Sequence, residues 1–258
     1  MSDKIISIKN IGFSYDKKEI YRDFSLDVDR NSVFFIMGVN GSGKTTLLKI
    51  LCSFLKIDSG SIHINEKNLY DYDRKSLSKI VSYVPQTISL NSDFLVKDYL
   101  ALGRTPYKSF CANINEDDYA MVEKKAQDLG IESLLGTNFN CLSGGQKQIV
   151  AICRALIQES EIIIMDEPMS ALDIGKQSEL LSLIVKLKKS GKTIILTSHN
   201  PNHALAIKNE CEVCLIHNGE IMGCGNSLDV LSQKNITALF GNGVTFDKDN
   251  CAINFKVD

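Results

Sequence analysis

The stretch Gly38-Val39-Asn40-Gly41-Ser42-Gly43-Lys44-Thr45 decides the fold of this chain. Its glycines, lysine and threonine have the spacing of a nucleotide-binding loop, in which backbone N–H groups wrap the phosphates of the ligand. Lys44 is expected to reach the terminal phosphates and to assist catalysis, and Thr45 to hold Mg²⁺. The residues expected to contact the nucleotide are Gly38, Asn40, Gly41, Ser42, Gly43, Lys44, Thr45 and Thr46.

The residues on either side of this loop supply the context that the motif needs. Residues 33–37 form a continuous apolar run that ends in glycine, as a buried parallel strand would. Residues 45–55 carry apolar side chains at helical spacing. The loop is therefore predicted to join a buried strand to a helix.

A second glycine-rich stretch, Leu142-Ser143-Gly144-Gly145-Gln146, precedes another apolar run at helical spacing. The stretch predicts a helix N-terminus that can bind an anion, with Ser143 serving as the helix cap and as a phosphate donor. One nucleotide needs only one such cradle. The second therefore suggests that two chains face each other and share their nucleotides.

Two acidic residues follow the apolar run 162–165. Asp166 and Glu167 are thus expected at the carboxyl edge of a buried strand, where open α/β sheets bind ligands. Asp166 is expected to support Mg²⁺ through its water shell. Glu167 is expected to polarise the water that attacks the γ-phosphate.

The remaining pattern predicts an α/β fold. Residues 4–9 and 25–29 alternate like half-exposed antiparallel strands, and residues 80–84, 162–165 and 193–197 read as further strands. Residues 213–217, the turn Asn218-Gly219 and residues 221–222 predict a hairpin. Helical signals dominate from about 93 to 159, and an amphipathic run covers 177–189. Strand–helix alternation of this kind favours a mostly parallel sheet covered by helices.

Composition narrows the possible roles of the chain. It has 258 residues, 44% of them hydrophobic and 23% charged, which is typical of a globular protein. The net charge of -2 supplies no global basic field, so no nucleic-acid partner is expected. The eight cysteines fit no compact disulfide framework, and no secretory signal is seen, so a reduced cytosolic compartment is expected. The apolar runs are too short to span a bilayer, and another polypeptide would have to do so.

A zinc site is a possible interpretation of Cys211-x-x-Cys214 with His217 and Cys224 nearby. Cys214 and His217, however, fall in an apparent strand, where residues three apart point to opposite faces. Ordinary core and surface thiols are therefore the preferred interpretation, and no metal site is predicted there.

These motifs, in this order, resemble the nucleotide-binding subunit of ATP-binding-cassette (ABC) transporters over nearly the whole chain. By that resemblance residues 38–45 are the Walker A motif, 162–167 the Walker B strand and 142–146 the signature motif. Residues 170–173, ending in Asp173, correspond to the dimer-contact D-loop. The resemblance implies one ABC ATPase domain over 1–258. Its P-loop core with a β portion would be 1–92 and 158–258, and its inserted helical subdomain 93–157.

Single residues match further family positions. Gln86 matches the glutamine that senses Mg²⁺ and the membrane partner, and His199 matches the switch histidine that contacts the γ-phosphate. Tyr15 matches the aromatic residue that stacks on adenine, although Phe13 alternates with it and either could stack or pack. Met169 departs from the threonine or serine usual at its position.

The resemblance implies ATP and Mg²⁺ as ligands and a dimer of ATP-binding subunits, expected to be a homodimer. Each nucleotide would lie between Lys44, Thr45 and Asp166 of one chain and Ser143, Gly144, Gly145 and Gln146 of the other. Two transmembrane permease subunits and, indirectly, a substrate-binding protein are the further partners implied. The expected location is the cytoplasmic face of the cell membrane, as a peripheral subunit.

Two stretches bear on the cargo. Residues 96–107 resemble the corresponding segment of importers of iron–siderophore, haem and cobalamin, and residues 198–205 resemble that class and its molybdate-type relatives. An ending near residues 239–241 also fits that class. An iron–siderophore complex is the expected cargo, with haem, cobalamin and molybdate as alternatives.

Three other roles share the nucleotide motifs. A cytosolic ABC ATPase of iron–sulfur cluster assembly has no membrane partner, and residues 96–107 favour the importer over it. ABC ATPases that act on DNA carry long coiled-coil insertions, whereas no sustained heptads separate Gln86 from Leu142. A nucleotide sensor without turnover is disfavoured because Glu167 and His199 are both present.

Overall fold

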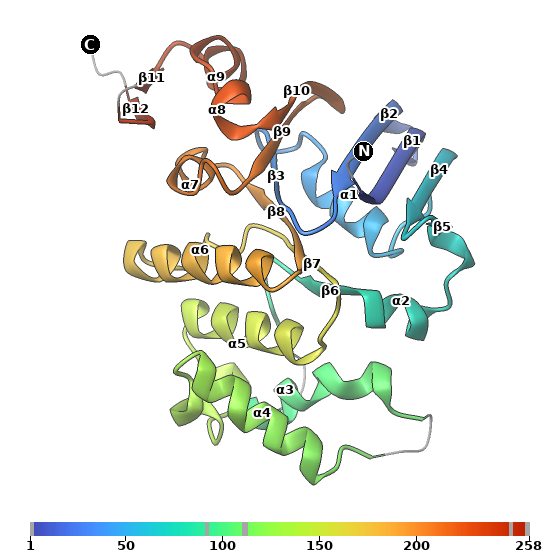
Figure 1. The fold of residues 1–258 in the computed structure, drawn as a ribbon, viewed down its shortest axis with the longest axis vertical. Helices are drawn as coiled ribbons and strands as arrows, with labels where there is room; N and C mark the ends of the chain where they lie inside the picture. Colours follow the sequence, from blue (N-terminus) through green and yellow to red (C-terminus); the bar gives the residue numbers. More distant parts are fainter. Residues whose placement is uncertain (1–2, 91–92, 110–112, 248–249, 256–258) are drawn as a thin grey trace.

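The structure is a computed structural model that describes residues 3–90, 93–109, 113–247 and 250–255 (Figure 1). Its strands form a four-stranded sheet in the order β2-β1-β4-β5, a six-stranded sheet in the order β10-β9-β3-β8-β7-β6, and the pair β11-β12. The α/β class, with an antiparallel N-terminal portion and a mostly parallel sheet, is confirmed.

The N-terminal sheet begins with a long antiparallel hairpin of β1 (Lys4–Tyr15) and β2 (Lys18–Asp29). Both strands extend well beyond the predicted 4–9 and 25–29. The register shifts between Ile8 and Ile11 and at later points, so strict alternation is lost and the sequence pattern no longer shows a strand. β4 (Ser59–Ile64) and β5 (Lys67–Asn68) complete this sheet and were not predicted.

The central sheet contains the parallel strands β9 (Glu212–His217), β3 (Val33–Met37), β8 (Thr193–Ser198), β7 (Ile162–Met165) and β6 (Val81–Val84). β10 (Glu220–Asn226) joins antiparallel to β9, as the predicted hairpin required. The prediction that Ile80 begins a strand is wrong. Helix α2 (Arg74–Ile80), which Asp73 caps at its start, extends to Ile80, and β6 starts at the next residue, Val81, whose N–H bonds the Leu77 carbonyl.

Two layers cover the central sheet because successive side chains of its buried strands point to opposite faces. Phe34 and Ile36 of β3 pack with the N-terminal sheet and helix α1 (Lys44–Leu51). Phe35 and Met37 pack on the other face with helices α5 (Gly144–Ile157) and α6 (Ile174–Lys189). α1 ends before the predicted residue 55, and Ser53 has a left-handed φ of 56°.

A helical segment forms its own apolar cluster at the end of the molecule away from the N-terminal sheet (Figure 1). It contains α3 (Val96–Ala101), α4 (Glu116–Asp128) and α5, with the short 3₁₀ turns η2 (Leu102–Tyr107), η3 (Glu132–Leu134) and η4 (Phe139–Cys141). A further 3₁₀ turn, η1 (Leu69–Asp71), follows β5. α5 belongs to both clusters, so the helix that starts at the signature stretch ties the helical segment to the central sheet.

The chain continues past the ending expected near residues 239–241. After α7 (Asn202–Ala206), α8 (Ser227–Val230) and α9 (Gln233–Phe240), β11 (Val244–Asp247) and β12 (Ala252–Phe255) form a hairpin. Asn202 accepts a bond from the Ile253 N–H (2.7 Å) and donates one to its carbonyl (3.1 Å), which attaches this hairpin to α7.

Candidate functional site

The glycine loop leaves β3 and ends at the N-terminus of α1. Gly41 and Gly43 have φ values of 81° and 104°, a backbone region that favours glycine. α1 has no side-chain cap and no acidic residue in its first turn, so its first N–H groups remain available to an anion. The Ser42 hydroxyl is buried and has no partner among the described residues. Both features fit a loop that binds phosphate oxygens.

Lys44 lies folded over the loop. Its Nζ donates to the carbonyls of Gly38 (2.8 Å) and Val39 (3.1 Å). Burial lowers the pKa of Lys44, and the carboxylates of Glu167 and Asp166 partly oppose that shift. A cation held over the glycine loop and facing carboxylates is placed to meet a phosphate chain.

Tyr21 of β2 fixes the loop from outside. Its hydroxyl donates to the Gly43 carbonyl at 2.9 Å, and a Cβ at Gly43 would lie only 2.7 Å from that hydroxyl oxygen. Burial raises the pKa of Tyr21 above its usual value, so the hydroxyl stays a donor. Sequence reasoning missed this residue, because a tyrosine on a neighbouring sheet carries no local motif.

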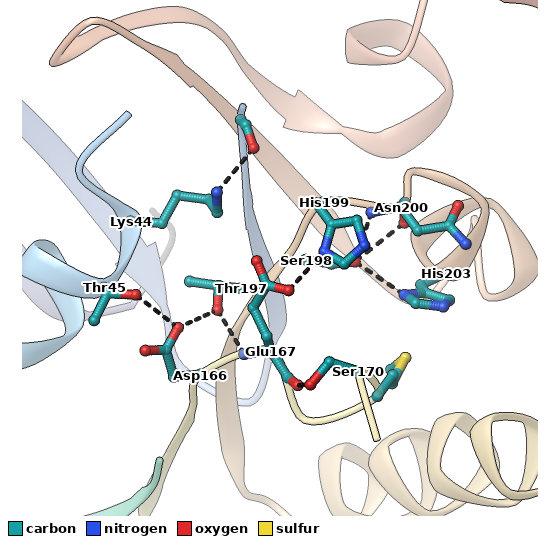
Figure 2. A network of polar contacts seen from close by, with 12 residues as sticks. Lys44, Thr45, Asp166, Glu167, Ser170, Thr197, Ser198, His199, Asn200 and His203 are labelled. Atoms are coloured by element: carbon teal, nitrogen blue, oxygen red, sulfur yellow. Dashed lines mark hydrogen bonds and ion pairs between the residues drawn. The ribbon is translucent and has the colours of Figure 1, made fainter. Parts of the chain in front are cut away.

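The oxygen atoms next to the loop converge at the carboxyl ends of β7 and β8 (Figure 2). Asp166 is 2% exposed, and its Oδ1 accepts bonds from the Thr45 hydroxyl (3.1 Å) and the Thr197 hydroxyl (2.7 Å). The same Thr197 oxygen accepts the backbone N–H of Glu167 at 2.7 Å. Hydroxyl and carboxylate oxygens are ligands that suit Mg²⁺, so Thr45 and Asp166 fit such an ion.

Glu167 and His199 lie in direct contact, with 2.6 Å between Oε2 and Nδ1 (Figure 2). Glu167 has a φ of 44°, an uncommon conformation for a residue other than glycine. Strained backbone of this kind is frequent at functional sites. The structure thus brings together Lys44, Thr45, Asp166, Glu167 and His199 from three separate predicted motifs.

Gln86 and Tyr15 lie on the surface. Gln86 is exposed in the loop after β6, the edge strand next to β7. Tyr15 ends β1 with 42% of its surface exposed, whereas Phe13 is buried and meets the Tyr15 ring edge-on at 4.9 Å. Tyr15, not Phe13, is therefore free to stack on a ligand.

The signature stretch forms the N-terminus of α5. The Ser143 hydroxyl accepts the Gln146 N–H and Gln146 Oε1 accepts the Ser143 N–H, a capping box that confirms Ser143 as the helix cap. A Cβ at Gly145 would lie 3.1 Å from the Ala171 carbonyl, so α5 starts against the 170–173 stretch. Asp173 caps α6 by accepting the Lys176 N–H at 2.9 Å.

The two glycine-rich stretches lie apart within one chain. In the described part of the chain, no hydrogen bond joins residues 142–146 to the 38–45 loop, Asp166 or Glu167. A cavity of about 650 Å³ lies between α5 and α6 beside Ser143 and Asp173, and one of about 130 Å³ adjoins Glu167 and His199. Neither of the carboxylates at the sheet edge, Asp166 and Glu167, lines the larger cavity.

Most of the described cysteines lie in the interior of the molecule. The described cysteines include four buried free thiols, and Cys111 lies outside the described residues. Cys214 is buried and pairs in register with Cys224 on β10, while the Cys211 thiol donates to the Ala204 carbonyl. Over the described residues, no group of three or more His, Cys, Asp or Glu side chains could hold a metal ion.

Comparison with known proteins decides the family. A family pattern described as ABC transporter matches residues 21–170. The chain belongs to the ABC transporter family. It is 30% identical to the molybdate import ATP-binding protein MolC of Haemophilus influenzae, over 92% of this chain and 88% of that protein. It is 28% identical to the iron(3+)-hydroxamate import ATP-binding protein FhuC of Bacillus subtilis, over 91% and 87%.

A solved structure supports the same conclusion. It is described as a metal-chelate type ABC transporter in an inward-facing conformation, and its chain superposes with a TM-score of 0.82 at 28% identity. The match covers 98% of this ABC ATPase and 97% of that chain. ATP hydrolysis coupled to transport is the general activity of the family, so this protein binds nucleotide and is an ATPase. No helix in the described ranges has the length and apolar character needed to cross a bilayer.

Two neighbours of the site were not singled out from the sequence of this ABC ATPase. Thr197 links Asp166 to the Glu167 backbone, and His203 bonds to the serine that precedes His199. A signal existed for Thr197, which is a hydroxyl that follows the apolar run 194–196 near the carboxyl end of a buried strand. Met169, the departure from the family pattern, is 3% exposed and packs in the core.

Proposed function

We propose that this protein is the ATP-hydrolysing subunit of a membrane importer whose cargo is a metal chelate, namely an iron–siderophore complex. The observation that carries the catalytic part is the contact between Glu167 and His199, next to the bonded set of Asp166, Thr45 and Thr197. A carboxylate with a histidine partner, one residue beyond a buried aspartate, suits the activation of a water beside a phosphate chain.

Each residue has a role in this proposal. Lys44 and the N–H groups of the 38–46 loop bind the phosphates, Thr45 and Asp166 hold Mg²⁺ with help from Gln86, and Tyr15 stacks on adenine. Mg²⁺ would neutralise charge on the phosphate oxygens. Glu167 accepts a proton from the attacking water through its carboxylate, and His199 holds the γ-phosphate.

The second half of each pocket comes from a second copy of the chain. Ser143, Gly144, Gly145 and Gln146 lie apart from the loop in one chain and form a capped helix start that suits an anion. The proposed dimer closes when ATP bridges Lys44 of one protomer and Ser143 of the other, and it opens after hydrolysis. Asp173 lies at the same protomer contact. Two permease subunits, contacted through Gln86 and the loop after it, would sense this motion at the cytoplasmic face of the membrane.

The names of two similar proteins support an iron chelate as the cargo. FhuC is named for iron(3+)-hydroxamate import, and the solved structure is described as metal-chelate type. Molybdate is the second candidate because MolC, 30% identical, is named for molybdate import. The two cargoes are distinguished by an uptake assay with vesicles that contain the permease and this subunit. Uptake of chelated ⁵⁵Fe is compared with uptake of molybdate. Recovery of the protein without any membrane partner would instead favour the soluble iron–sulfur assembly role.

The catalytic assignment is tested with Glu167→Gln. We expect ATP binding to persist while steady-state phosphate release falls about 10²–10⁴-fold, because the amide cannot accept the proton. Glu179→Gln is the matched control, since Glu179 is exposed on α6 and pairs with Lys176 one turn away. Unchanged turnover in Glu167→Gln removes Glu167 from this role.

A further inference from the structure

A chain of hydrogen bonds runs from the loop that carries His199 to the loop that follows Glu167. Ser198 Oγ lies 2.9 Å from His203 Nδ1, and His203 Nε2 lies 3.3 Å from Gln177 Oε1 (Figure 2 shows the serine and the histidine). The Gln177 amide nitrogen donates to the carbonyls of Met169 (3.2 Å) and Leu172 (3.0 Å). The chain therefore connects three elements, β8, α7 and α6, around the cavity of about 130 Å³ next to Glu167.

The donors and acceptors give this chain one direction. Carbonyls only accept, so the Gln177 NH₂ group must face Met169 and Leu172, and its oxygen must face His203. His203 then donates from Nε2 and presents a lone pair at Nδ1. The single proton of the Ser198 hydroxyl can reach that nitrogen (2.9 Å) or the Asn200 carbonyl (3.2 Å), and we place it on the shorter contact, where Nδ1 needs a donor. Every member donates toward the 169–172 stretch, an arrangement in which successive hydrogen bonds reinforce one another.

His203 keeps this arrangement at neutral pH. Burial is the main cause that lowers the pKa of His203 to about 4, and the charge of His199 is the second cause. The ring is therefore neutral, and its two nitrogens have fixed and different roles. A neutral histidine with both nitrogens bonded serves as a spacer of fixed length between two loops.

The two loops carry the two halves of the catalytic contact. The first, residues 198–200, contains His199, and Ser198 Oγ also accepts the Asn200 N–H at 3.0 Å. The second, residues 167–173, begins with Glu167, whose carbonyl accepts bonds from the Ser170 N–H (3.1 Å) and hydroxyl (3.0 Å). Any shift of one loop against the other would change the 2.6 Å contact between His199 and Glu167.

We propose that His203 and Gln177 are positioning residues that hold the 198–200 loop against the 167–173 loop, and so set His199 relative to Glu167 for hydrolysis. This proposal rests on the function proposed above for Glu167 and His199. It also ties the placement of the catalytic pair to residues 170–173, the stretch that resembles a dimer contact. Within the described ranges, His203 and Gln177 make no hydrogen bond to the 38–45 loop, so we expect ATP binding to be retained when they are replaced.

The test is a double-mutant cycle with His203→Asn and Gln177→Leu. Asn retains an acceptor for Ser198 but lacks the Nε2 donor, and Leu removes the amide that bonds Met169 and Leu172. Each single variant should lower kcat about 10- to 100-fold, the scale of effect that a displacement of about 1 Å produces, while KM for ATP changes less than about twofold. Because either break disconnects the chain, the double variant should be within about threefold of the slower single variant.

The controls separate positioning from damage to the fold. Gln127→Leu makes the same substitution on an exposed position of α4 and should leave kcat unchanged. Rates are expressed per ATP-binding chain, so loss of folded protein does not lower them, and thermal unfolding is recorded for every variant. If His203→Asn does not fold, Gln177→Leu at a half-buried position still decides the outcome by its kcat and KM.

The outcomes are distinct. Unchanged kcat in both single variants, or a double variant whose loss equals the product of the two single losses, overturns the proposal. A rise in KM with kcat unchanged also overturns it, because that would place the residues in nucleotide binding. Glu167→Gln is assayed alongside. If that variant keeps full turnover, the proposed function itself fails, whereas a dead Glu167→Gln with normal His203 and Gln177 variants defeats only this inference.

Discussion

At the scale of single residues, Thr197 connects Asp166 and Glu167 at the carboxyl end of β7. Its hydroxyl oxygen accepts the Glu167 N–H, and its proton is donated to the Asp166 carboxylate. One hydroxyl group therefore positions the backbone of Glu167 and the side chain of Asp166. Glu167 keeps a left-handed φ of 44°, a conformation that costs on the order of 1–3 kcal/mol outside glycine. The Thr197 bond is one of the contacts that offset this cost.

Replacing Thr197 with Val is therefore expected to reduce both stability and activity. The substitution keeps the side-chain shape but leaves the Glu167 N–H and an Asp166 lone pair without that partner. We expect a loss of about 1–3 kcal/mol in the free energy of unfolding, measured by urea denaturation. Phosphate release should fall about tenfold or more, because Glu167 is no longer held.

Thr193→Val is the matched control at the opposite end of β8. The Thr193 hydroxyl accepts the Asn31 N–H at 3.0 Å, so this variant also loses a hydrogen bond of a buried threonine. Its stability should fall by a similar amount while its kcat per folded chain stays unchanged. Equal kcat in the Thr193 and Thr197 variants would show that Thr197 matters to the fold alone.

At the scale of the element, the start of α5 combines two properties. The capping box satisfies N–H groups of the first turn and stabilises the helix, and the helix dipole makes the same end attractive to anions. Ser143 can serve both, since its hydroxyl accepts the Gln146 N–H and keeps a proton to donate. Substitutions that preserve the cap but change the charge separate the two properties.

Ser143→Asp and Ser143→Ala are expected to differ in their effect on stability. Asp caps a helix about as well as Ser and suits the dipole, so the free energy of unfolding should be retained. Its carboxylate would repel the γ-phosphate, so the ATP-dependent dimer should be lost. Ala removes the cap and should cost about 1 kcal/mol of stability. Urea denaturation measures the free energy of unfolding. Size-exclusion chromatography of the same variants in the Glu167→Gln background measures the ATP-dependent dimer. A dimer that forms equally well in the Ser143→Asp variant excludes Ser143 from contact with the phosphate.

At the scale of the whole molecule, each chain carries two helix starts that suit an anion and that lie apart within the chain. The N-terminus of α1 follows the glycine loop, and that of α5 lies against the 170–173 stretch at the edge of the helical segment. Bringing the positive ends of two such helices together is unfavourable without a bridging anion. In the proposed dimer, a triphosphate between protomers would supply that anion, and its cleavage would remove the bridge.

The Glu167→Gln protein is therefore expected to be monomeric without nucleotide, dimeric with ATP and Mg²⁺, and monomeric again with ADP. Light scattering measures the mass in each state. Adding Lys44→Ala to this variant should weaken ATP binding and prevent the dimer, which provides the control. A protein that stays monomeric with saturating ATP at high concentration, even with its permease present, contradicts the shared pocket.

Local sequence determined the glycine loop between strand and helix, the cap at Ser143, the acidic pair after β7 and the hairpin β9–β10. Each depends on residues a few positions apart, whose spacing already specifies phosphate binding, capping or pairing. Local pattern failed where β1 and β2 bulge and at Ile80, an apolar residue that ends α2 and directly precedes β6.

Only the tertiary structure decided which polar groups meet at the carboxyl edge. Thr197 reaches Glu167, and His203 reaches Gln177, because the parallel register of β7 against β8 and the packing of α6 on the sheet bring these residues together. Register between parallel strands depends on contacts from the whole core, and no short stretch of sequence contains them.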